Sequence, residues 1–179
     1  ETMSIDDSKH SLFGASKLAA DIYCQEYWKY FDLKVGVFRG CCLTGPLHQG
    51  AELHGFLSYL IKAAKEKKKY YIFGYKGKQV RDNIHSEDVV NAVWEFYKTK
   101  DNNGVYNIGG GRENSCSIFE IIDILKIKYD IQLKHQLINK NRSGDHIWYI
   151  SDNSKFKSRH KNWKIKRNLE NIIEEIVEN

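Results

Sequence analysis

Residues 34–39 read Lys-Val-Gly-Val-Phe-Arg, and residues 44–46 after them read Thr-Gly-Pro. A short run of β-branched and aromatic residues that ends in a turn signal is typical of a buried strand. Before this stretch, Ser11 can cap a helix that reaches Phe31, because small and apolar residues recur there at helical spacing. After it, apolar residues recur at helical spacing over 52–66. This helix–strand–helix order predicts an α/β fold with at least part of a parallel sheet.

The alternation of strands and helices continues toward the C-terminus. We expect strands over 70–73 and near 132–137, a strand with a glycine turn over 104–111, and helices over 86–98, 117–129, 151–160 and 168–177. We assign a turn to residues 74–78. Ser86 is the expected N-cap of its helix, and Asp88 is favourably placed near the positive end of the helix dipole.

The chain has 179 residues, of which 41% are hydrophobic and 28% charged, and its formal net charge is +5. This composition is ordinary for a globular protein with its own core. No apolar run approaches the roughly 18–20 residues of a membrane helix, so we expect no membrane partner. The lysine run at 65–69 predicts a solvated helix end, and we expect no nucleic-acid partner. Because the chain opens on Glu1, we interpret it as a piece of a longer protein.

Metal and dinucleotide motifs are incomplete in this sequence. The cysteines, which lack the paired spacing of a zinc site, are Cys24, Cys41, Cys42 and Cys116. We expect free thiols and a cytoplasmic protein. His48 and His54 have only Glu52 as a further nearby ligand, and a helix would place them on different faces, so we predict no metal. The glycines at 109–111 lack the third glycine of a dinucleotide fingerprint, because Asn114 occupies its position.

Residues 10–17 read His-Ser-Leu-Phe-Gly-Ala-Ser-Lys and open the first predicted helix. Residues four apart share one face of a helix, so Phe13 and Lys17 should point into the same cleft. The pair offers a cation but no acid–base group, because a benzene ring cannot exchange a proton. Taken alone, the pattern is also that of a buried aromatic residue beside a surface lysine.

A series of short motifs follows along nearly the whole chain. In order, they are His10-Ser11…Gly14-x-Ser16-Lys17, Phe38-Arg39, Thr44-Gly45-Pro46, Gly74-x-x-Gly77-x-Gln79-x-Arg81-Asp82-x-x-His85-x-x-Asp88-Val89, Tyr106-Asn107-Ile108-Gly109-Gly110 and Arg142-x-Gly144-Asp145. Together they resemble the C-terminal half of the extended short-chain dehydrogenases/reductases, the NAD-dependent epimerase/dehydratase family that acts on nucleotide sugars. Residues 43–60 and 75–85 are most similar to the CDP-paratose (CDP-tyvelose) 2-epimerases of that family.

The resemblance implies the C-terminal half of a Rossmann-type parallel sheet with a small α/β substrate-binding subdomain. Residues 1–50 and 79–111 would form the Rossmann-type part, and residues 51–78 and 112–179 the nucleotide-sugar-binding subdomain. The family's glycine-rich phosphate loop would lie in the half that this sequence lacks. The resemblance further implies NAD as cofactor, a homodimer and a role in polysaccharide biosynthesis.

Individual residues also receive roles from the resemblance. Phe13 stands at the position of the family's catalytic tyrosine, and Lys17 would hold the nicotinamide ribose. The residues implied to line the nicotinamide pocket are Gly40, Cys41, Cys42 and Leu43. Those implied to bind the nucleotide sugar are Leu53, Gln79, Arg81, Arg142 and Asp145. His85 is expected to anchor the turn before its helix.

Some alternatives stay open from the residues alone. The adjacent cysteines could be reactive or could serve in packing, and Arg81 with Asp82 could bind phosphate or form a structural ion pair. The resemblance implies carbon-2 epimerisation of a CDP-linked deoxyhexose by transient oxidation with bound NAD. The phenylalanine at position 13 leaves a second hypothesis, a catalytically impaired family member that binds a nucleotide sugar or dinucleotide without turnover.

Overall fold

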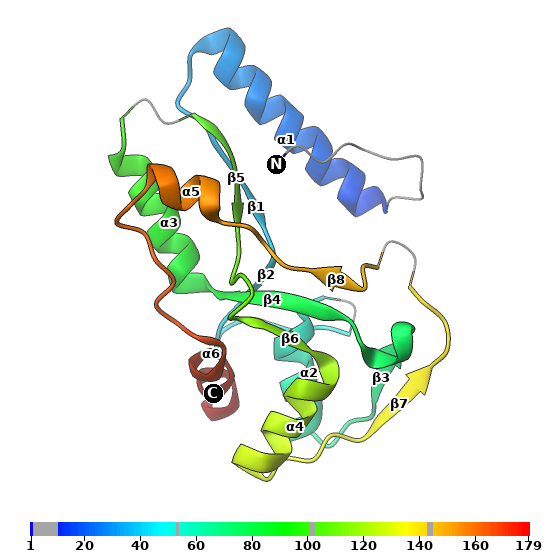
Figure 1. Cartoon of the computed structure of the whole chain (residues 1–179). Helices are drawn as coiled ribbons and strands as arrows, with labels where there is room; N and C mark the ends of the chain where they lie inside the picture. Colours follow the sequence, from blue (N-terminus) through cyan, green and yellow to red (C-terminus); the bar gives the residue numbers. More distant parts are fainter. Residues whose placement is uncertain (2–10, 53, 101–102, 143–144) are drawn as a thin grey trace.

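The computed structural model describes residues 1, 11–52, 54–100, 103–142 and 145–179 (Figure 1). Its helices are α1 (Leu12–Phe31), α2 (Phe56–Lys65), α3 (Ser86–Lys98), α4 (Ile118–Tyr129), α5 (Ser154–Arg159) and α6 (Leu169–Glu178). Its strands are β1 (Gly36–Gly40), β2 (Cys42–Thr44), β3 (Tyr70–Phe73), β4 (Val80–His85), β5 (Gly104–Ile108), β6 (Ser115–Ser117), β7 (His135–Ile138) and β8 (Trp148–Tyr149). A short 3-10 turn, η1 (Tyr75–Gly77), occupies the predicted turn after β3.

Local capping explains why several helices begin where the sequence predicts. The Ser11 hydroxyl accepts a hydrogen bond from the Gly14 N–H at 2.9 Å and caps α1. Ser117 and Glu120 cap α4 reciprocally, because the side chain of each accepts from the backbone N–H of the other. Asn168 begins α6 in the same way. The predicted helices over 86–98, 117–129 and 168–177 are thereby confirmed to within a residue or two.

The start of α2 differs from the prediction. The helix begins at Phe56 and not at residue 52. Ala51 and His54 exchange two backbone hydrogen bonds of 2.7 and 2.9 Å, which close a tight turn. Gly55 then has a φ of +80°, a conformation that favours glycine and is incompatible with a helix running through it.

The cap of α3 also differs from the prediction. His85, and not Ser86, is the N-cap, because its Nδ1 accepts a hydrogen bond from the Glu87 N–H at 3.1 Å. This contact confirms that His85 anchors the turn before the helix. Asp88 is fully buried, and its carboxylate accepts hydrogen bonds from the backbone N–H groups of Lys166 and Arg167. Its main role is therefore to hold the C-terminal segment.

The strands pair mostly in parallel, as predicted. β1 pairs in parallel with β5, and β3 with β7. β4 lies in the middle of a further group, where it pairs in parallel with β2 and β8 and antiparallel with β6. The sequence did not predict β4, because its polar Arg81, Asp82 and Asn83 interrupt the apolar pattern of a buried strand.

The buried residues form two cores. The first joins α2, β3, α4 and α6 around Leu60, Ile72 and Ile121. The second joins β4, α3, β5 and α5, and Phe38, Phe96 and Phe156 meet there edge to face. The division into a Rossmann-type part and a nucleotide-sugar-binding subdomain stays a prediction.

Helix α1 lies on the opposite side of β1 from α3 and α5 (Figure 1). Neighbouring residues of β1 point to opposite faces, so Phe38 enters the second core while Arg39 faces α1. The Arg39 Nε forms an ion pair of 2.7 Å with Asp21 of α1. No residue of α1 is buried by the described part of the chain.

Candidate functional site

A cavity of about 440 Å³ lies between β2, β4, the start of α2 and the segment that follows β7. Three residues predicted to bind the cofactor line it: Cys41, Cys42 and Leu43. Four residues predicted to bind the substrate line it as well: Gln79, Arg81, Arg142 and Asp145. The structure thus brings together residues that lie up to a hundred positions apart in the sequence.

Strand alternation places one row of polar side chains on the cavity wall. Arg81 and Asn83 lie on β4, and Gln79 comes directly before it. The three residues alternate along the chain, so they share one face, and all three line the cavity. Cys42 of β2 pairs in register with Asn83. The row therefore runs from the turn before β4 to the strand pair β2–β4.

The charged centre of the cavity is a carboxylate between two guanidinium groups. Arg81 Nη2 lies 2.7 Å from Asp145 Oδ1, and Arg142 Nη2 lies 3.6 Å from Asp145 Oδ2. Arg81 also donates to the backbone oxygens of Val80 and His146, which fixes the plane of its guanidinium. The two guanidinium groups exceed the Asp145 carboxylate by one positive charge, which suits a phosphate group. Glu52 also lines the cavity and carries a second carboxylate.

The ion pair between Arg81 and Asp82, one of the two alternatives that the sequence left open, is not formed. Phosphate binding by Arg81 stays a prediction. Asp82 lies on the other face of β4 and does not pair with Arg81. Its buried carboxylate accepts hydrogen bonds from the backbone N–H groups of Gly111 and Ser151, at 3.0 and 3.1 Å. The ion pair of Arg81 is made with Asp145, which is itself a predicted site residue.

The cysteines of the cavity wall are free thiols of low acidity. Burial raises the pKa of Cys42 to about 11, and the neighbouring Arg81 lowers it only in part. Burial also raises the pKa of Cys41, and the Asp82 carboxylate adds to the effect. Because the thiolate is the reactive form, these shifts favour the packing role over a reactive one.

His48 and His54 are close together, contrary to the prediction. Both precede α2, and their ring centroids are 6.0 Å apart. His48 Nδ1 lies 3.3 Å from the Ser58 hydroxyl, which in turn lies 3.0 Å from the buried Thr44 hydroxyl. Burial lowers the pKa of His48, and His54 lowers it further. Among the described residues, no group of three side chains could hold a metal ion.

Phe13 and Lys17 lie outside the cavity. They share one face of α1 as predicted, and Lys17 Nζ lies 5.4 Å from the centroid of the Phe13 ring. Phe13 is 65% exposed, so the expected cleft is not formed around it by the described residues. Gly40 ends β1 and is exposed, and Leu53 lies outside the described residues.

Sequence patterns did not predict several residues of the cavity wall. Asn83, Tyr70 and Ile118 line it beside the predicted residues. Alternation from Arg81 would have indicated Asn83 if β4 had been recognised as a strand. Tyr70 and Ile118 were assigned only to a strand and a helix, because apolar residues carry no signal that separates a core position from a cavity wall.

The parallel strands and the flanking helices form an α/β arrangement of the Rossmann type. Residues 1–109 match the model of the NAD dependent epimerase/dehydratase family, and the chain belongs to this family. The expected fold class is confirmed, and NAD is the cofactor of the family.

Individual relatives agree with this assignment. CDP-paratose 2-epimerase of Salmonella typhi is 29% identical over 149 residues, which cover 80% of this chain and 44% of the relative. dTDP-D-glucose 4,6-dehydratase of Homo sapiens is 28% identical over 142 residues, which cover 78% of this chain and 37% of the relative.

Solved structures show the same fold. One is a tyrosine-to-phenylalanine mutant of the Bacillus cereus UDP-glucuronic acid 4-epimerase, in complex with UDP-4-deoxy-4-fluoro-glucuronic acid and NAD. It is 25% identical with a TM-score of 0.79, and the match covers 99% of this chain and 56% of that one. The chain therefore spans about half the length of the relatives it matches. None of the helices in the described ranges is long and apolar enough to cross a membrane.

Proposed function

We propose that this chain forms the substrate-binding half of an NAD-dependent nucleotide-sugar epimerase that inverts carbon 2 of a CDP-linked deoxyhexose. The observation that carries the proposal is the cavity in which Arg81, Arg142 and Asp145 meet the segment Cys41–Leu43. The similarity to CDP-paratose 2-epimerase supports the choice of substrate.

Diphosphate binding follows from the charged centre of the cavity. A planar guanidinium binds two phosphate oxygens at once, and Arg81 is already fixed by its contacts to Val80 and His146. The diphosphate takes over the interactions that Asp145 makes with the two arginines in the free protein. The Asp145 carboxylate can then accept a hydrogen bond from a ligand hydroxyl.

Of the residues that would hold the cofactor, Lys17 lies near the N-terminal end of α1, whereas Cys41, Cys42 and Leu43 line the cavity. Lys17 has no ion-pair partner among the described residues, and its ammonium suits the two hydroxyl groups of the nicotinamide ribose. When bound, NAD would supply the hydride acceptor for the oxidation at carbon 2 and the hydride donor for the reduction from the opposite face. The oxidation also releases the proton of the carbon-2 hydroxyl, and Phe13 has no atom that can take it. We propose that another side chain or a water molecule held by Lys17 does so.

The test is turnover by the longest natural protein that contains this chain. It is incubated with CDP-paratose and with CDP-tyvelose, and the carbon-2 proton is followed by NMR. We expect each sugar to convert to the other without net consumption of NAD. Bound cofactor and bound nucleotide sugar without any interconversion would refute the epimerase.

A second candidate function is ligand binding without turnover. Phe13 is the specific observation in its favour, since a phenyl ring cannot act as the proton-transfer group. The Bacillus cereus structure is a tyrosine-to-phenylalanine mutant and still contains both NAD and a nucleotide-sugar analogue. Phe13→Tyr separates the two candidates. Activity that appears only in this variant identifies a natural binder, whereas a fast wild type and a slower variant identify an epimerase with an altered proton path.

A further inference from the structure

We propose that His48 takes the proton that the carbon-2 hydroxyl releases, through a hydrogen-bonded chain formed by Thr44 and Ser58. Thr44 contacts the substrate hydroxyl, and His48 is the base at the other end of the chain. This inference rests on the proposed function, and it names the side chain that does the work of the phenol missing from position 13.

The three side chains form a continuous line that starts at the cavity wall. The Thr44 hydroxyl lies 3.0 Å from the Ser58 hydroxyl, which lies 3.3 Å from His48 Nδ1. Thr44 and Ser58 are 3% and 4% exposed, so bulk water has little access to either hydroxyl group. Thr44 and His48 both line the cavity that contains the charged centre. A proton can therefore pass between the cavity and the imidazole along protein groups alone.

Strand β2 places Thr44 at the end of the cavity where the reaction is proposed. Alternation along β2 puts Thr44 on the same face as Cys42, and both residues line the cavity. Thr44 directly follows the segment Cys41–Leu43, which is proposed to face the nicotinamide. The reacting carbon must lie beside the nicotinamide to exchange a hydride with it, so the carbon-2 hydroxyl lies at this end of the cavity.

The turn before α2 is built around the His48 ring. The His48 N–H donates to the Gly45 oxygen at 3.1 Å, and the His48 oxygen accepts from the Gly50 N–H at 2.9 Å. Gly55 has no side chain, and a Cβ atom at this position would lie 2.7 Å from His48 Cε1. The backbone thus fixes His48 and leaves room for its ring, as a base that must face one hydroxyl group requires.

Burial and a neighbouring imidazole keep His48 in the form that accepts a proton. Burial lowers the pKa of His48, and His54, whose ring centroid is 6.0 Å away, lowers it further. The ring is therefore neutral at pH 7. The other charged groups that line the same cavity are Glu52, Arg81, Arg142 and Asp145.

One proton on each hydroxyl sets the direction of the chain. When Ser58 donates to His48 Nδ1, its oxygen accepts from Thr44, and the Thr44 oxygen is left to accept from the ligand. On oxidation, the carbon-2 C–H bond gives a hydride to NAD, and the O–H bond gives its proton to Thr44. Thr44 passes its own proton to Ser58, and Ser58 passes its own to His48, which becomes an imidazolium. The reduction of the ketone reverses each transfer and returns the proton.

The first experiment determines the protonation of His48 by long-range proton–nitrogen NMR of this chain, with His48→Gln to identify its signals. We expect the neutral ring to carry its proton on Nε2, because Nδ1 accepts from Ser58. We also expect the ring to titrate below the ordinary pKa of histidine. A neutral ring that carries its proton on Nδ1 overturns the inference. This measurement needs neither cofactor nor substrate, so its outcome does not depend on the proposed function.

The second experiment follows the interconversion of the two CDP-sugars by the longest natural protein that contains this chain. His48→Gln and Ser58→Ala should each lower kcat at least about 100-fold and change the affinity for the nucleotide sugar by less than about threefold. The double variant should be no slower than either single one, because both substitutions break the same path. His135→Gln, which replaces an exposed histidine on β7, is the matched control and should leave kcat unchanged.

The pH profile separates a base from a merely structural residue. We expect kcat of the wild type to fall as the pH drops through the lowered pKa of His48, because an imidazolium cannot accept the proton. His54→Gln should raise this pKa and move the fall to higher pH. Turnover that His48→Gln leaves intact overturns the inference while the proposed function survives. A wild type that binds both ligands and does not interconvert the sugars overturns the two together.

Discussion

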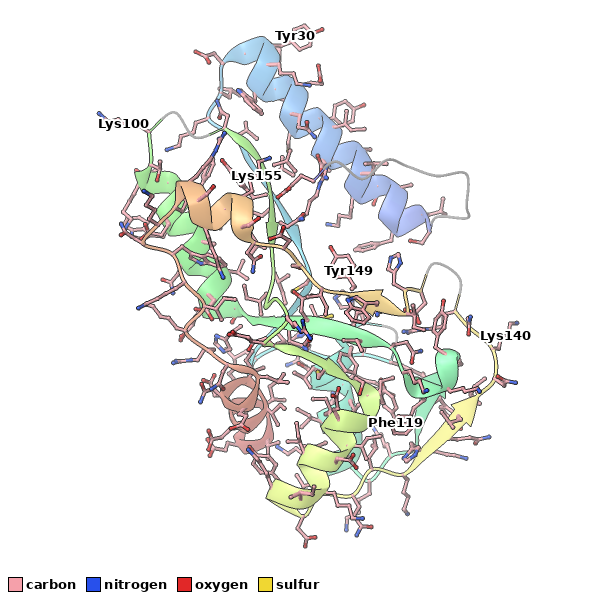
Figure 2. All side chains as sticks on the ribbon, viewed as in Figure 1. Tyr30, Lys100, Phe119, Lys140, Tyr149 and Lys155 are labelled. Carbon is pink, nitrogen blue, oxygen red and sulfur yellow. The ribbon has the colours of Figure 1, made fainter. Side chains whose placement is uncertain are left out.

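Helix α1 and the helices around the first core differ in how much of their surface the rest of the chain covers. α2, α4 and α6 bury apolar side chains such as Leu60, Ile121 and Ile173 against one another. α1 buries none, and Tyr30 at its outer end is 78% exposed and points away from the rest of the molecule (Figure 2). The cavity therefore lies against a core that this chain supplies itself. The surface that carries Phe13 and Lys17 does not.

An ion pair joins α1 to strand β1. Asp21 of α1 pairs with Arg39 of β1 at 2.7 Å. Burial acts to raise the pKa of Asp21, but its hydrogen bonds with Arg39 and Gln25 and the charge of Arg39 outweigh this and lower it. The Asp21 carboxylate therefore stays ionised near neutral pH, and the ion pair with Arg39 is maintained there. The ion pair can orient α1, but it provides no apolar burial.

The largest expected effect is the loss of a side chain from the second core. Phe156→Ala removes a fully buried ring that packs against Phe38, Tyr106 and Trp163. We expect the free energy of unfolding to fall by about 3–5 kcal/mol, from lost burial and the cavity left behind. Urea denaturation followed by circular dichroism measures it. If the free energy of unfolding fell by less than about 1 kcal/mol, Phe156 would not be tightly packed in the 179-residue chain, and the second core would need another part of the longer protein to complete it.

A difference in thiol reactivity is the next largest effect. Cys24 lies exposed on α1, whereas Cys42 is buried in the cavity wall with a pKa raised to about 11. At pH 8 only about one Cys42 side chain in a thousand is ionised, so we expect iodoacetamide to modify Cys24 at least about 100-fold faster. The raised pKa means that the rate at Cys42 should climb as the pH approaches 11. Peptide mass spectrometry measures both sites, and unfolding in urea should abolish the difference. Comparable rates in the folded chain would contradict the buried position of Cys42.

The sequence could predict what depends on local signals. The Ser11 cap and the helical spacing of residues 11–31 predicted α1, and the motif order predicted the fold class and seven of the residues that line the cavity. The pairing of Arg81 with Asp145 could not be predicted, because it joins residues 64 positions apart and depends on the course of the chain after β7. Asn83 was missed for a similar reason, since its role depends on the register of β2 with β4. The placement of Phe13 and Lys17 outside the cavity depends on what covers α1, on which local patterns carry no information.

The third prediction concerns the C-terminal segment that Asp88 holds. Asp88→Asn replaces a buried carboxylate that accepts from the N–H groups of Lys166 and Arg167. An amide has one acceptor atom in place of two, so we expect a loss of about 1–3 kcal/mol in the free energy of unfolding. Asp123→Asn, on the exposed side of α4, is the control and should change stability by less than about 0.5 kcal/mol. Equal effects of the two substitutions would contradict the anchoring role of Asp88.

The smallest expected effect tests the comparison most directly. Tyr30→Ala should change the stability of this chain by less than about 0.5 kcal/mol, because the ring buries little surface here. In the longer protein, or in the homodimer that the sequence predicts, the same ring can be covered, and its removal should then cost more than about 1 kcal/mol. Denaturation at two protein concentrations separates these cases, since only self-association makes the effect grow with concentration. A large loss of stability that does not depend on concentration in the 179-residue chain would show that α1 is already packed within this chain. The site of Phe13 and Lys17 would then need no further surface to complete it.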